Sequence, residues 1–162
     1  MKKGMCEMMT IDEDGKYQKS AKNFTLIAAI LLTITTFLAV LQTVYLVALR
    51  NTDLSKIGEL TKNQVANIEA SITIPTILFF AAVALIYLVF TVCMYVFTIR
   101  IKKEQGVSVI PYFGTIVLVA YSFLQSALAV NLVNAILYLI TGLVAGIALF
   151  FLYKMRNIKS SR

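Results

Sequence analysis

Three long apolar stretches, separated by shorter polar segments, dominate the chain. Two of them cover residues 24–49 and 73–99, and the third, from 107 to 153, contains no Asp, Glu, Lys or Arg. Runs such as ILFFAAVALIYLVF are apolar at both odd and even positions, whereas the strands of a membrane barrel alternate apolar and polar residues. Because a backbone in lipid must satisfy its own hydrogen bonds, this pattern predicts membrane-spanning helices.

The charge-free stretch is too long for a single span. A bilayer core about 30 Å thick takes about 20 helical residues, and residues 107–153 would extend about 70 Å as one helix. The stretch must therefore fold back, and the Asn residues near its midpoint favour a turn at 129–132. The predicted fold is an all-α integral membrane protein, an antiparallel bundle of four transmembrane helices. The expected spans lie near residues 24–49, 73–100, 108–129 and 132–153.

Polar segments complete the predicted organisation. We expect residues 1–23 to form a flexible charged tail, residues 154–162 a basic tail, and residues 50–72 an extracytoplasmic loop. Within that loop, Thr61 and Gln64 have the spacing of a capping box, which indicates a short helix ahead of the second span. The first apolar run is about 26 residues long, so we expect it to be retained as a span and not removed as a secretory signal.

Basic residues are divided unequally among the polar segments. Of the fifteen Lys and Arg, all but Arg50, Lys56 and Lys62 lie before the first span, between the second and third, or after the fourth. The positive-inside rule then predicts that both termini are cytoplasmic. Beside anionic lipid, each such side chain would gain about 1 kcal/mol. The expected anionic-lipid contacts are Lys19, Lys22, Arg100, Lys102, Lys103, Lys154 and Arg156.

The composition agrees with a membrane protein and limits the kinds of reaction and transport that we expect of the chain. The chain is 59% hydrophobic and 14% charged, with a net charge of +7 and a mean hydropathy of +0.82, whereas about a quarter of the residues of a soluble protein are charged. It has no His, and the apolar runs 24–49, 73–99 and 107–153 hold no ionisable acid or base other than Tyr and Cys93. Because catalysis and ion-coupled transport rely on such groups, we expect neither an enzyme nor a coupled transporter. No cofactor, metal or nucleic acid is expected, and the Lys-rich, Trp-free sequence favours a bacterial plasma membrane.

Small and hydroxyl-bearing residues share one face of the first, third and fourth predicted spans when residues are placed at 100° intervals. Such faces allow helix backbones to approach closely and to form hydrogen bonds across the contact. Gly142 and Gly146 form a GxxxG pattern, which serves either packing within the chain or a homodimer. The residues expected to support helix packing are Gly114, Ser122, Gly142 and Gly146.

Amides and hydroxyls also occur towards the predicted outer ends of the spans. They could surround a polar vestibule that binds a small ligand, a lipid headgroup or a partner's helix, or they could simply be polar because helix ends lie near water. The candidate vestibule residues are Gln42, Thr43, Gln125, Ser126, Asn131 and Asn134.

The class of function that remains is non-catalytic. We expect a multi-pass membrane protein that acts through helix packing as an accessory, assembly or immunity-type subunit of a membrane complex. Its partners would be membrane lipids together with another membrane protein or a second copy of itself. The alternative is a small oligomeric channel or facilitator, with a neutral polar lining that opens on the extracytoplasmic side.

Overall fold

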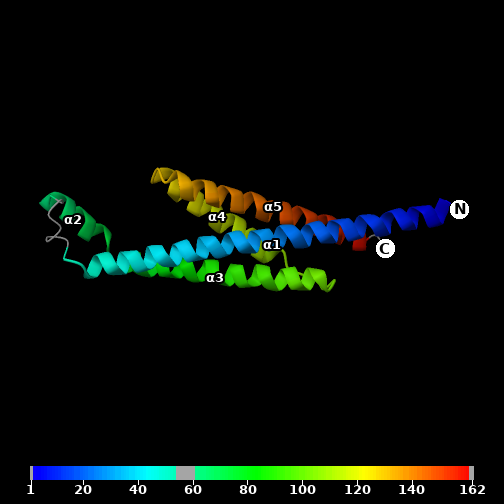
Figure 1. Ribbon diagram of the computed structural model, residues 1–162, viewed down its shortest axis with the longest axis horizontal. Helices are drawn as coiled ribbons and strands as arrows, with labels where there is room; N and C mark the ends of the chain where they lie inside the picture. Colours follow the sequence, from blue (N-terminus) through cyan, green and yellow to red (C-terminus); the bar gives the residue numbers. More distant parts are fainter. Residues whose placement is uncertain (1, 54–60, 161–162) are drawn as a thin grey trace. The chain divides into compact units, whose positions relative to one another are not determined.

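The computed structural model of the chain describes residues 2–53 and 61–160, with side chains for 15–53, 61 and 63–157. Within these ranges the regular structure consists of five helices and no strands (Figure 1). The helices are α1 (Lys2–Asn51), α2 (Lys62–Ser71), α3 (Ile74–Lys102), α4 (Ile110–Leu128) and α5 (Leu132–Ser160). All except α2 contain a segment long and apolar enough to cross a membrane. The chain is therefore a multi-pass integral membrane protein.

The spans begin and end close to the predicted positions, but two helices extend further. α1 is helical from Lys2, so the described backbone of the expected flexible tail continues the first helix, and α5 likewise continues to Ser160. Residues 2–23 contain no Pro to interrupt a helix. Once a span has nucleated a helix, each further residue adds a hydrogen bond without repeating the cost of nucleation.

The capping box predicted in the loop is confirmed at the start of α2. The Thr61 backbone N–H donates to Gln64 Oε1 over 2.9 Å, and the Gln64 backbone N–H donates to Thr61 Oγ1 over 3.4 Å. At the start of α3, the Thr76 backbone N–H donates to Thr73 Oγ1 over 3.3 Å. Two local signals thus set where α2 and α3 begin.

The predicted turn between the third and fourth spans is confirmed, since α4 ends at Leu128 and α5 begins at Leu132. The Val130 N–H donates to the Ala127 carbonyl over 3.1 Å and the Asn131 N–H to the Ser126 carbonyl over 2.8 Å, which is the Schellman pattern of helix ends. The left-handed residue is Val130, with φ 56°, where the sequence indicated an Asn. α4 and α5 then pack against each other as a helical hairpin (Figure 1).

Packing divides the chain into two units, which are described separately. The first unit contains the residues up to Thr33 and those from Phe90 onwards, and the second contains Ile34–Val89. In the first unit, buried residues recur at intervals of three and four, the spacing of helices packed at a shallow angle. On α4 they are Tyr112, Thr115, Val119 and Ser122, and on α5 Ala135, Tyr138, Thr141, Ala145, Ala148, Leu152 and Met155.

Candidate functional site

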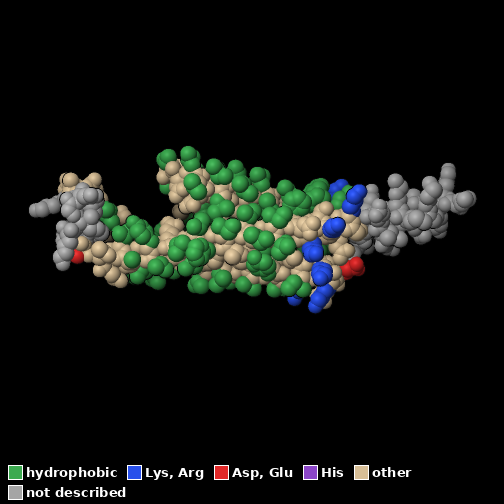
Figure 2. Space-filling view, viewed as in Figure 1, with side chains coloured by type: hydrophobic (Ala, Val, Ile, Leu, Met, Phe, Trp, Pro, Cys, Tyr) green, Lys and Arg blue, Asp and Glu red, His purple; other side chains and the backbone are tan. Residues whose placement is uncertain are grey.

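Basic side chains gather at one end of the first unit, at the edge of its apolar surface (Figure 2). Gln18 Nε2 donates to the Ile101 carbonyl over 2.9 Å, which ties α1 to the end of α3. An Arg156 guanidinium nitrogen donates to the Val107 carbonyl, which ties α5 to the segment before α4. We call this group the basic collar: Lys19, Lys22, Arg100, Lys102, Lys103, Lys154 and Arg156. All of these side chains are exposed except that of Lys22, which is half-buried.

Aromatic rings lie beside the collar and fix α5 against α1. The Phe24 and Phe151 rings stack with their centroids 5.4 Å apart. The Lys154 ammonium lies 6.0 Å from the Tyr17 ring centroid and 5.7 Å from that of Phe150, within the range of a cation–π attraction. These side-chain contacts between α1 and α5 therefore help to keep the basic collar together at this end of the unit.

Buried hydroxyl groups lie along the helix contacts of the first unit. The fully buried Tyr112 hydroxyl is 2.8 Å from Thr25 Oγ1, which also donates to a carbonyl one turn earlier in α1. Thr141 Oγ1 donates to a carbonyl of its own helix over 2.8 Å. Thr115 Oγ1 is buried and has no hydrogen-bond partner among the described residues. Because most of these hydroxyls are hydrogen-bonded within a packed seam, the seam suits helix association better than a polar path.

The expected packing residues differ in how tightly they are enclosed. A Cβ placed on Gly114 would lie 2.5 Å from Phe90 Cζ, so this glycine allows α3 and α4 to approach closely. A Cβ on Gly142 would lie in ordinary contact, 3.5 Å from Val119 Cγ1. Gly146 departs from the expectation, because a Cβ there would meet nothing within 4 Å among the described residues. Ser122, the remaining residue expected to support packing, is buried on α4.

Four of the six candidate vestibule residues lie at the tip of the α4–α5 hairpin. Gln125 Nε2 donates to the Tyr121 hydroxyl over 2.6 Å, and both side chains are exposed. Asn131 Oδ1 accepts from the Asn134 backbone N–H over 3.2 Å and so caps the start of α5. Ser126 is half-buried at the end of α4. These bonds are local to the helix ends.

The other two vestibule candidates lie on the part of α1 that belongs to the second unit. Gln42 is exposed, and the half-buried Thr43 donates to the carbonyl one turn earlier over 2.9 Å. A network that joins these residues to the hairpin tip stays a prediction.

α4 as a whole combines low hydropathy with high exposure, a feature that the sequence reasoning missed. The spanning segment of α4 has a mean hydropathy of 1.3, against 2.5 to 2.7 for the other three spans, yet only 17% of it is buried, against 22 to 33%. Exposed residues follow one another at intervals of four and three along this helix. We call this surface the α4 face: Phe113, Val117, Tyr121, Leu124 and Leu128. A heptad-like spacing of large residues on the third span was the signal that could have revealed it.

Across the part of the chain that the structure describes, no three His, Cys, Asp or Glu side chains come close enough together to hold a metal ion. The chain matches no protein-family model, and no curated protein or solved structure is significantly similar to it.

Proposed function

We propose that this protein is a non-catalytic accessory, assembly or immunity-type subunit of a membrane complex, and that it docks on its partner through the α4 face. The observation that carries the proposal is the mismatch on α4. A bundle that stands alone in lipid is expected to bury its least apolar helix and expose its most apolar ones, because polar groups in lipid lack hydrogen-bond partners. Here α4, the least apolar span, leaves the polar side chains of Tyr121 and Gln125 exposed.

The chemistry of the α4 face fits a partner's transmembrane helix. Its exposed residues are spaced as the large side chains of packed helices are, so they can insert between residues of a facing helix. Tyr121 on this face and Gln125 at its edge provide a hydroxyl and an amide, which keep unused donors and acceptors beyond their mutual bond. Hydrogen bonds between membrane helices contribute about 0.6 kcal/mol on average, so van der Waals packing would supply most of the affinity.

The orientation that we propose has four antiparallel spans and both termini in the cytoplasm, in a bacterial plasma membrane. The excess of Lys and Arg at one end of the first unit supports it, and the collar would rest on anionic lipid. Single cysteines at Lys19 and Thr52, in a Cys6→Ser/Cys93→Ser background, test it in intact cells. An impermeant thiol reagent is expected to modify the Thr52 position only. Modification of the Lys19 position alone would reverse the orientation.

A second candidate function follows from the Tyr121–Gln125 pair. If copies of the chain met through their α4 faces, these polar groups would lie along the axis of an oligomer and could line a small channel or facilitator. The occupant of the α4 face therefore distinguishes the subunit from the channel.

Photo-cross-linking in native membranes identifies that occupant. Benzoylphenylalanine replaces Val117 on the α4 face, and in a matched control it replaces Val92 on α3, which is similarly exposed at 54% against 68%. We expect Val117 to yield one discrete adduct with another membrane protein and Val92 to yield none. An adduct at about twice the 18.0 kDa of the chain would instead favour the channel. Equal, diffuse labelling from both positions would contradict docking through α4.

A further inference from the structure

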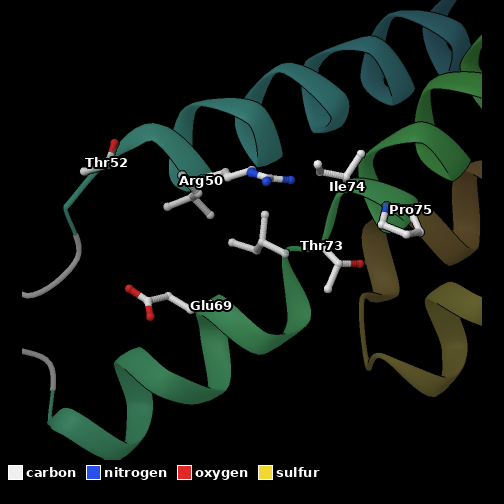
Figure 3. Close-up of a pocket in the computed structure, with 8 residues that line it drawn as sticks. Arg50, Thr52, Glu69, Thr73, Ile74 and Pro75 are labelled. Atoms are coloured by element: carbon white, nitrogen blue, oxygen red, sulfur yellow. The ribbon is translucent and has the colours of Figure 1, made fainter.

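A cavity of about 490 Å³ opens in the second unit, between the end of α1, the end of α2 and the start of α3 (Figure 3). Its volume lies within the range of small-molecule sites. Leu49 and Ile74, from the ends of two membrane-spanning helices, contribute apolar walls. The polar lining consists of Arg50, Glu69 and the hydroxyl residues Thr52 and Thr73.

Local sequence explains why the chain is hollow at this point. α2 ends at Ser71 and α3 begins at Ile74, so two residues separate the helices, and the first of them, Ile72, is buried. The hydroxyls of Thr73 and Thr76 lie 2.8 Å apart, and Pro75 follows in the first turn of α3, where a missing N–H costs no helical hydrogen bond. α2 therefore cannot continue straight into the span, and its last turn faces the end of α1 across the cavity (Figure 3).

Opposite charges occupy different parts of the cavity. The Arg50 guanidinium extends towards Ile74, back along α1, whereas the Glu69 carboxylate lies on the side of Thr52 (Figure 3). Neither side chain makes an ion pair with another described residue. Arg50 occupies the last turn of α1, where a cation can interact with the final carbonyls, but its guanidinium points away from that end of the helix (Figure 3).

We propose that this cavity binds the headgroup of a zwitterionic phospholipid of the phosphatidylethanolamine type. The phosphate binds Arg50, whose guanidinium offers paired N–H donors to phosphate oxygens, and the ammonium binds Glu69. The acyl chains continue along Leu49 and Ile74 into the bilayer. A purely anionic lipid fits less well, because Glu69 repels it, and the ends of two spans place the cavity at the depth of lipid headgroups.

Binding of short-chain lipids to the purified full-length protein tests the proposal. Isothermal titration in detergent compares dihexanoyl phosphatidylethanolamine, dihexanoyl phosphatidylglycerol and tail-free glycerophosphoethanolamine. We expect the tailed ethanolamine lipid to bind about tenfold more tightly than either of the others, because a hydrogen bond to a charged group contributes at least such a factor and the tails add apolar burial. Equal affinity for the tail-free head would assign the site to a soluble zwitterion and overturn the lipid.

Variants at the two charges separate their roles. Arg50→Gln is expected to weaken binding of the ethanolamine lipid about tenfold, and Arg50→Lys to restore only part of that loss, because Lys keeps the charge but not the paired donors. Glu69→Gln should abolish the preference for ethanolamine over glycerol. Asn67→Lys is the matched control, because it also makes α2 more positive by one charge but lies outside the cavity lining. This variant should keep the preference for the ethanolamine lipid. Unchanged affinities in both Arg50→Gln and Glu69→Gln would overturn the site.

Discussion

Replacing Val130 with Gly is expected to stabilise the α4–α5 hairpin. Val130 has φ 56°, in the left-handed region, and its backbone completes the hydrogen bonds that end α4. A residue with a Cβ in this conformation is disfavoured by about 1–2 kcal/mol, and the β-branched Val has no side-chain hydrogen bond that could offset the strain. Gly adopts the same backbone without that cost.

The expected gain is smaller than the strain, because Gly also loses more freedom when the chain folds. That loss is about 0.5–1 kcal/mol, so the net stabilisation should be about 0.5–1 kcal/mol. Little packing is lost, since the Val130 side chain is 78% exposed. By the scaling of soluble domains of this size, about 2–4 °C per kcal/mol, the midpoint Tm should rise by about 1–4 °C.

The measurement is the fraction of protein that stays monodisperse after stepwise heating in mild detergent. Val133→Gly is a matched control, because it removes the same side chain at the same 78% exposure from inside the first turn of α5. There Gly only lowers helix propensity, so the Tm should fall. If both substitutions lower the Tm to the same extent, the side chain of Val130 contributes more than its backbone costs, and the reasoning is wrong.

Two further predictions concern helix packing. Gly114→Ala should destabilise the protein by about 1 kcal/mol, the low end of overpacking costs, because the tip of the half-buried Phe90 ring would have to move away from the new Cβ. Gly146→Ala should be neutral or stabilising. The same thermal assay distinguishes them, and equal effects would contradict the close contact. Tyr112→Phe should cost about 0.6 kcal/mol, the average for an interhelical hydrogen bond, while Tyr153→Phe, which changes an exposed ring, should cost nothing measurable. A Tyr153 effect as large as that of Tyr112 would mean that the buried bond is not responsible.

The number and bounds of the spans could be predicted from the sequence, because lipid requires each crossing to satisfy its own backbone and the apolar runs have the corresponding length. The position of the turn near Val130 followed from the same length argument. Which residue takes the left-handed conformation did not follow, since it depends on the register at which α4 ends, and the nearby Asn residues were the better local candidates.

Features that arise from packing between helices were harder to predict. Gly146 belongs to a sequence pattern associated with close helix contact, yet no neighbour approaches its Cβ position, while Gly114, next to no such pattern, meets the ring of Phe90. The cavity beside Arg50 depends on the angle between α2 and α3; Thr73 and Pro75 indicate a break between these helices but do not specify that angle. Periodicity identifies which residues share a face, but the facing element decides whether that face is filled.

The length of α4 strengthens the case for docking through its exposed face. Its 19 residues extend about 28 Å, close to the thickness of the bilayer core, whereas the 29 residues of α3 extend about 43 Å. A helix longer than the core adjusts by tilting, so it would cross an untilted partner helix and contact it over only part of its length. α4 has no such excess, so its face can meet a partner helix in one register across the whole core. Cross-linking should then follow the four-and-three spacing, with adducts from Val117 and Leu124 and none from the half-buried Ile116 between Thr115 and Val117.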